Sequence, residues 1–155
     1  HQGSIDHWEQ MIDTNVKGLI YLTKAIVGQM IDRKEGHIIN IGSIAGRNAY
    51  RNGNVYCATK AAVDSLTQSM RIDFLPYNIK VSQVAPGAVE TEFSLVRFEG
   101  DEQKAANVYK GFTPLYPDDV ADAVFYLASL PPHVNVNDIL LIPTAQACAG
   151  IIHKE

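Results

Sequence analysis

Residues 37–62, HIINIGSIAGRNAYRNGNVYCATKAA, contain a short apolar run, a turn-rich segment and the start of a slim helix. The run at 37–41 is nearly continuous and rich in β-branched residues, which is typical of a parallel strand buried on both faces. Glycines and asparagines fill the segment 42–54, as they do in loops. Small residues at 58–62 would let a neighbouring element approach the helix closely. This succession of strand, loop and helix predicts an α/β fold.

The same alternation continues on both sides of this stretch. A first helix is expected to begin at Ser4 and to fade by 33–36, with a helical period of apolar residues that predicts one buried stripe. The stripe consists of Trp8, Ile12, Leu19, Leu22, Ile26 and Met30. The further elements expected are a helix over 55–75 ended by Pro76, a strand over 79–84, a helix from Pro117 to 130 and a strand over 138–142. Residues 88–116 show little period, which indicates a functional or mobile segment.

Composition excludes several classes of protein. The 155 residues are 46% hydrophobic and 19% charged, which is typical of a globular domain, and the net charge of −4 offers no basic surface to nucleic acid. No apolar run reaches the roughly 18 residues that span a bilayer. Cys57 and Cys148 lie far apart, which suits a reducing cytoplasm, and the histidines lack the spacing of metal ligands.

Four polar residues are candidates for chemistry. Tyr56 and Lys60 are four apart on the second helix and so share one face. Ser43 follows the carboxyl end of the first strand, where open α/β sheets bind ligands. Asn15 lies within the apolar stripe of the first helix and needs a buried partner or a water. Taken singly, each has an ordinary explanation: a turn serine, an amphipathic surface pair and a satisfied core amide.

Together these residues resemble a known signature. Ser43, twelve residues and then Tyr56-x-x-x-Lys60 is similar to the active site of the short-chain dehydrogenases/reductases, and Asn15-Val16-Lys17-Gly18 resembles the family's Asn-x-x-Gly motif. Pro86-Gly87-Ala88-Val89-Glu90-Thr91 resembles the segment that touches the nicotinamide. Stretches at 54–56, 91–98 and 130–137 resemble the NADP-dependent 3-hydroxy acid dehydrogenases, which include serine 3-dehydrogenases.

The resemblance implies a fold, a reaction and a set of roles. The fold expected is part of a Rossmann-like, doubly wound parallel sheet with about three strands and three main helices. The reaction expected is hydride transfer between NADP, with NAD as the alternative, and a small serine-like 3-hydroxy acid. Tyr56 is expected to act as general base, Ser43 to bind the substrate oxygen and Asn15 to position a water. The cofactor-binding residues expected are Tyr56, Lys60, Pro86, Gly87, Val89 and Thr91.

The pKa of Tyr56 is the quantity that this chemistry depends on. A free tyrosine titrates near pH 10, and lowering that pKa to about 7 takes roughly 4 kcal/mol. An ammonium about 4 Å away at an effective dielectric of about 20 supplies a similar energy. Lys60 is therefore expected to lower the pKa of Tyr56, although burial would oppose it.

A hydroxy acid carries a carboxylate, which predicts an arginine near the pocket. Arg97 is the first candidate because it lies in the irregular 88–116 segment, followed by Arg51 and then Arg47. The alternative for each is a solvated surface arginine.

The chain departs from the family in one large respect. The glycine-rich turn that holds the pyrophosphate and the Asn-Asn-Ala-Gly motif have no counterpart, so residues 1–155 are expected to be the C-terminal, catalytic part of one dinucleotide-binding domain and to be inactive alone. Three alternatives stay open. The first is another substrate class of the short-chain dehydrogenases, and the second is a nucleotide-sugar epimerase, which the Pro-Gly segment disfavours. The third is a non-catalytic binding or oligomerisation module of the same fold. The resemblance also implies a homo-oligomer, dimeric or tetrameric, paired through the first two helices.

Overall fold

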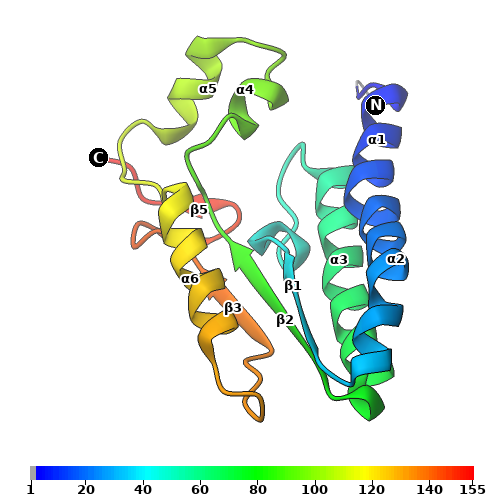
Figure 1. The fold of residues 1–155 in the computed structure, drawn as a ribbon. Coiled ribbons are helices and arrows are strands. Elements are labelled where there is room, and N and C mark those ends of the chain that lie inside the picture. Colours follow the sequence, from blue (N-terminus) through cyan, green and yellow to red (C-terminus); the bar gives the residue numbers. More distant parts are fainter. Residues whose placement is uncertain (1–2) are drawn as a thin grey trace.

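The computed structural model describes residues 3–155 and consists of a parallel sheet with helices on both faces (Figure 1). The strands, in spatial order, are β1 (Gly36–Ile41), β2 (Ile79–Pro86) and β3 (Asp138–Leu141). Gly36 pairs with Ile79, and Gln83 pairs with Asp138. One face carries α1 (Ile5–Ile12), α2 (Gly18–Arg33) and α3 (Asn54–Asp73), and the other carries α6 (Pro117–Ser129). The predicted doubly wound α/β fold is confirmed.

Helix boundaries follow the expected local signals. The Ser4 side chain caps α1 by accepting from the His7 N–H at 3.4 Å. Pro117 occupies the first turn of α6, and Asp119 closes a capping box by accepting from the Tyr116 N–H at 2.7 Å. The predicted helix over 55–75 ends slightly earlier, at Asp73, because Pro76 lies in the short 3-10 turn η3 (Leu75–Tyr77) that follows.

Burial of the strands differs from the prediction. β2 is the strand that is covered on both faces, with Val81, Val84 and Ala85 fully buried. β1 lies at one edge of the described sheet and is buried at alternate positions, so that Ile41 is 47% exposed. The prediction that 37–41 is buried on both faces is therefore wrong for the described chain, because α6, the helix on the second face, packs mainly against β2 and leaves that side of β1 partly open.

The buried stripe of α2 is also displaced from the prediction. Thr23 is the buried residue of this helix, and Leu19, Val27, Met30 and Ile31 pack on the core formed by Ile38, Met70, Ile79 and Val81. Leu22 and Ile26, predicted to be buried, are 62% and 36% exposed, and Ile12 is 41% exposed. The apolar residues form a band wider than the sheet can cover, and only the edge through 19, 23 and 27 contacts it.

The segment 88–116 and the C-terminus are more ordered than expected. Two short helices, α4 (Phe93–Arg97) and α5 (Glu102–Tyr109), lie above the carboxyl ends of the strands, and Asp101 caps α5 by accepting from the Lys104 N–H at 2.9 Å. A hairpin that the sequence did not predict, β4 (Gln146–Cys148) and β5 (Ile151–Ile152), lies beside them. Within residues 3–155, no helix is both long enough and apolar enough to cross a membrane.

Candidate active site

Ser43 lies directly after β1, at the carboxyl edge of the sheet. It begins the 3-10 turn η2 (Ile44–Gly46), with its Oγ accepting from the Ala45 N–H at 3.1 Å and facing the Pro86 carbonyl at 3.5 Å. The turn packs against the catalytic-side face of α3, since a Cβ on Gly46 would lie 2.7 Å from the Lys60 carbonyl oxygen. The predicted close approach at the small residues of this helix is confirmed.

Tyr56 and Lys60 project from the first two turns of α3 toward this turn. The Lys60 Nζ donates to the Ile41 carbonyl at 3.1 Å, and the Tyr56 ring packs on Phe93 with the ring centroids 5.3 Å apart. Both residues line a cavity of about 520 Å³ together with Ser43. The three groups predicted to act together therefore share one cavity.

The pKa of Tyr56 is shifted in the direction opposite to the prediction. Burial raises the pKa of Tyr56, and this exceeds the lowering by a hydrogen bond with Ser43 and by the charge of Arg97. Burial likewise lowers the pKa of Lys60. The prediction that Lys60 depresses the tyrosine pKa is wrong for this structure, because the ammonium is directed at the β1 carbonyl and desolvation dominates.

Asn15 has the buried partner that its position demanded. It lies in η1 (Asp13–Lys17), a π-helical turn between α1 and α2, and such turns occur often at functional sites. Its Nδ2 donates to the Thr59 Oγ1 at 3.1 Å, and that hydroxyl donates to the Tyr56 carbonyl at 2.8 Å. Asn15, Tyr56 and Lys60 also line a second cavity, of about 600 Å³. The amide is thus fixed to the backbone of the helix that bears Tyr56.

The Pro-Gly segment forms another wall of the 520 Å³ cavity. Pro86, Gly87, Val89 and Thr91 all line it. The Gly87 N–H donates to the Leu141 carbonyl at 2.7 Å, which continues the sheet, and the Thr91 Oγ1 accepts from the Phe93 N–H at 3.2 Å. The predicted cofactor-binding residues are therefore brought beside Tyr56.

Of the three candidate arginines, Arg97 lies at the cavity. It lines both cavities, and its guanidinium sits 5.6 Å from the Tyr50 ring centroid and 5.4 Å from that of Phe98. Arg51 is exposed in the loop before α3, and Arg47 is paired with Asp138. Of these three arginines, Arg97 is the one placed to meet an anionic ligand in the cavity.

Sequence reasoning missed several residues that line the cavity. They are Tyr50, Phe93, Tyr109 and Gln146. Tyr109 belongs to a short helix and Gln146 to a short strand, and neither element has a period long enough to detect. An aromatic residue at 50 in a loop rich in Gly and Asn was a usable signal, because such a side chain needs something to pack against.

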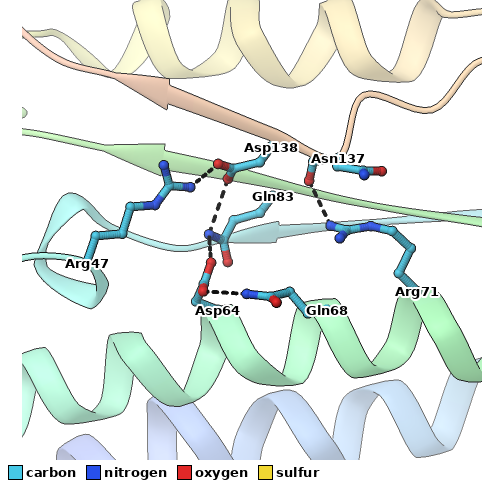
Figure 2. Close-up of polar contacts among 7 residues, drawn as sticks. All are labelled: Arg47, Asp64, Gln68, Arg71, Gln83, Asn137 and Asp138. Carbon is cyan, nitrogen blue, oxygen red and sulfur yellow. Dashed lines mark hydrogen bonds and ion pairs between the residues drawn. The ribbon is translucent and has the colours of Figure 1, made fainter.

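A polar cluster joins this site to the far edge of the sheet (Figure 2). Gln83, on β2 and 2% exposed, donates from its Nε2 to Asp64 at 2.9 Å and to Asp138 at 3.4 Å. Arg47, which directly follows η2, pairs with the same Asp138. Among the residues that the structure describes, the buried Gln83 Oε1 has no partner. The cluster ties the turn that begins at Ser43 to β3 and to α3.

Comparison with known proteins agrees with this geometry. The sequence model of the short chain dehydrogenase family matches residues 1–101. The NADP-dependent 3-hydroxy acid dehydrogenase of Salmonella typhi is 47% identical over 99% of this chain and 63% of its own length. The NADP-dependent 3-hydroxy acid dehydrogenase of Schizosaccharomyces pombe is 41% identical over 98% of this chain and 59% of its own length. The chain thus spans about three fifths of these relatives.

Solved structures give the same result. A closed form of serine dehydrogenase complexed with NADP+ superposes with a TM-score of 0.94 at 46% identity, over 100% of this chain and 63% of that one. Serine dehydrogenase from Escherichia coli has a TM-score of 0.79 at 39% identity, over 95% of this chain and 58% of that one. The chain belongs to the short chain dehydrogenase family.

Proposed function

We propose that the protein carrying this chain is an NADP-dependent oxidoreductase that transfers hydride between the coenzyme and the hydroxyl or carbonyl of a small, serine-like 3-hydroxy acid. The observation that carries the proposal is the convergence of Ser43, Tyr56 and Lys60 on one cavity walled by the Pro-Gly segment. The names of the relatives, which refer to NADP, 3-hydroxy acids and serine, support the coenzyme and the substrate class. Residues 1–155 would act as the catalytic part of a single dinucleotide-binding domain.

The cavity suits the nicotinamide end of the coenzyme. Its polar groups include the Tyr56 hydroxyl, the Lys60 amine and the Thr91 hydroxyl, which match a ribose and a carboxamide. Gly87 lets the wall pack closely on Gln146, because a Cβ there would collide with that side chain. Lys60 and Tyr56 would hold the ribose, and Val89 and Thr91 the carboxamide. NADP, when bound, supplies the hydride or accepts it.

Tyr56 is the residue that would donate or accept the proton. With its pKa raised by burial, the phenol is protonated at neutral pH and is ready to give its proton to a substrate carbonyl oxygen. Ser43, which lines the same cavity as Tyr56, would stabilise the charge that develops on that oxygen. In the oxidative direction Tyr56 must take a proton, which requires a cation near the phenolate. Lys60 can be this cation once its ammonium turns from the Ile41 carbonyl toward the cavity.

Arg97 is the residue proposed to bind the substrate carboxylate. Burial raises the pKa of Tyr50 and of Tyr56, and the charge of Arg97 opposes that rise at both groups, which supports a place for Arg97 near the reacting phenol. It belongs to α4, lines the cavity, and has its guanidinium within cation–π distance of two aromatic rings. A substrate whose carboxylate binds Arg97 would lie in the same cavity as Tyr56.

The test uses the natural protein that carries this sequence. NADPH formation is followed by its near-ultraviolet absorbance with serine, 3-hydroxyisobutyrate and an uncharged alcohol. We expect turnover of the hydroxy acids, loss of turnover in Tyr56→Phe, and in Arg97→Ala a KM raised about 100-fold for the acid but little for the alcohol, since a charged hydrogen bond contributes roughly 1.5–3 kcal/mol. Arg51→Ala, an exposed arginine of the neighbouring loop, is the matched control. No turnover of any hydroxy acid would favour a non-catalytic module.

We also propose a homo-oligomer, dimeric or tetrameric, that pairs through α2 and α3. The described chain leaves three apolar side chains exposed here, Ile12 at the end of α1 and Leu22 and Ile26 in α2. Such apolar surface is suited to burial against a second copy. Sedimentation of the protein should give at least twice the monomer mass, and Leu22→Glu should lower it to the monomer mass.

A further inference from the structure

The backbone from Gly87 to Val89 is held by side chains that come from distant parts of the chain. Gln146 reaches it from the C-terminal hairpin, and Tyr109 reaches it from α5. Both residues lie beyond residue 101, where the match to the family model ends. The wall of the cavity that faces the proposed nicotinamide site is thus fixed from outside the matched region.

Gln146 contacts this backbone through a short, buried bridge. The residue is 5% exposed, its Oε1 accepts from the Ala88 N–H at 2.9 Å, and its Nε2 donates to the Cys148 carbonyl at 3.2 Å. Both ends of the amide are therefore satisfied within the described chain. A Cβ on Gly87 would collide with the Gln146 Oε1, so the amide fills the space that the glycine leaves.

Tyr109 holds the backbone two peptides further along, at the Val89 carbonyl. Its hydroxyl donates to the Val89 carbonyl at 2.8 Å and lies 2.7 Å from the Ser94 Oγ, which must then be the donor to the phenol oxygen. Ser94 is 3% exposed and belongs to α4, the helix that also carries Arg97. One phenol therefore connects α5, α4 and the Pro-Gly segment.

These bonds leave one group of the segment available. Leu115 donates to the Ala88 carbonyl at 2.9 Å and accepts from the Glu90 N–H at 2.8 Å, so the polar groups of Val89 point away from Leu115. The Val89 carbonyl is taken by Tyr109. Within residues 3–155, the Val89 N–H has no acceptor, and the residue lines the cavity.

We propose that Gln146 and Tyr109 are positioning residues that orient the backbone at Ala88 and Val89 so that the Val89 N–H can bind the nicotinamide carboxamide. The inference rests on the proposed function, because it assumes that NADP occupies the cavity. Gln146 holds the Gly87–Ala88 peptide and Tyr109 holds the Val89–Glu90 peptide, so the two side chains flank the peptide that carries the Val89 N–H. Neither side chain needs to touch the coenzyme.

The test compares two ligands of the natural protein that carries this sequence. NADP+ contains the nicotinamide, whereas adenosine 2′,5′-bisphosphate contains the adenine end alone. In Gln146→Met, which keeps the length but not the hydrogen bonds, we expect NADP+ to bind about tenfold more weakly, equivalent to one hydrogen bond of roughly 1.4 kcal/mol. Tyr109→Phe should weaken NADP+ binding by a similar factor, since it loses one hydroxyl. Both variants should bind adenosine 2′,5′-bisphosphate like the wild type, and this also shows that they are folded.

Tyr77→Phe is the matched control, because Tyr77 lies at the opposite end of α3, in η3, and should bind both ligands normally. If Gln146→Met and Tyr109→Phe bind NADP+ as tightly as the wild type, the positioning role is overturned. Equal weakening of both ligands overturns it as well, because the effect would then be a general loss of structure. Wild-type protein that binds neither ligand would refute the proposed coenzyme itself, a different result from the first two.

Discussion

Gly46 offers a sharp test of how the serine turn and the catalytic helix are held together. A Cβ at this position would lie 2.7 Å from the Lys60 carbonyl oxygen, 2.8 Å from its carbon and 3.1 Å from the Ala61 nitrogen. All three atoms are backbone, and ordinary contact begins at 3.4 Å, so Gly46→Ala forces the turn and α3 apart by about 0.7 Å. The turn cannot move freely, because Ile44 and Ala45 are 5% and 3% exposed. We therefore expect a loss of unfolding free energy of about 1–3 kcal/mol, typical of overpacking.

The same displacement should reach the chemistry. Ser43 begins the turn that moves, whereas Tyr56 belongs to the helix that resists. Misplacement of a catalytic group by about 1 Å can cost roughly 100-fold in rate, so we expect kcat/KM of Gly46→Ala to fall by about 10- to 100-fold. The measurements are urea unfolding followed by circular dichroism and steady-state hydride transfer.

Gly28→Ala is the matched control, because a Cβ at Gly28, within α2, would meet nothing within 4 Å. Alanine is the better helix former, so this variant should gain about 0.5–1 kcal/mol and keep its activity. The close contact at Gly46 is refuted if Gly46→Ala proves as stable as the wild type. If the variant loses stability but keeps full activity, the link between the turn and the position of Ser43 is refuted.

The remaining predictions concern titration and the polar cluster. Burial raises the pKa of Tyr56 above the unfolded value near 10, so the stability that Tyr56 contributes is lost as pH rises above 10. In a tyrosinate absorbance titration of the folded protein, the Tyr56→Phe variant should lack only signal that the wild type shows well above pH 10. Burial lowers the pKa of Lys60, so its charge destabilises the folded state at every pH below the unfolded value near 10.5. Lys60→Met should therefore raise the urea midpoint of unfolding at pH 7 while abolishing hydride transfer. An unchanged or lower urea midpoint would contradict the burial of the charge. Asp138→Asn removes the charged partner of Arg47 and should cost about 1 kcal/mol in urea unfolding, the upper end for a partly exposed ion pair. Asp32→Asn, on the surface of α2, should change the unfolding free energy by less than about 0.5 kcal/mol.

The parts of the fold that could be predicted are those governed by local pattern. A continuous apolar run followed by a slim helix predicts a parallel strand and its crossover, and the carboxyl ends of such strands share one edge. That rule brings Ser43 near the Pro-Gly segment, and the four-residue spacing of Tyr56 and Lys60 brings them to the same place. None of these steps needs tertiary information.

The parts that could not be predicted depend on contacts across the fold. The hairpin at 146–152 has strands of two and three residues, too short to show a period, and it is held by bonds such as that from the His153 N–H to the Ala145 carbonyl. Which edge of the α2 band contacts the sheet depends on how the helix is rotated, which the apolar spacing leaves open. The direction of Lys60 was missed because a strand carbonyl competes for its ammonium.

The raised pKa of Tyr56 and the lowered pKa of Lys60 have one common cause, burial in a site that has to exclude water. Folding this site is therefore opposed by the buried ammonium of Lys60, and above about pH 10 also by a phenolate at Tyr56, and the opposing free energy must be offset elsewhere. The offset is visible in the rigid surroundings: the Gly46 contact with α3, the Gln83 bridge between two aspartates, and Gln146 on the Pro-Gly segment. Each of these contacts joins elements that are distant in sequence. Each therefore fixes a distance between functional groups that no single helix or strand could set alone. A cation arriving beside the phenol would lower the tyrosine pKa without any movement of this frame, since only the Lys60 side chain has to turn.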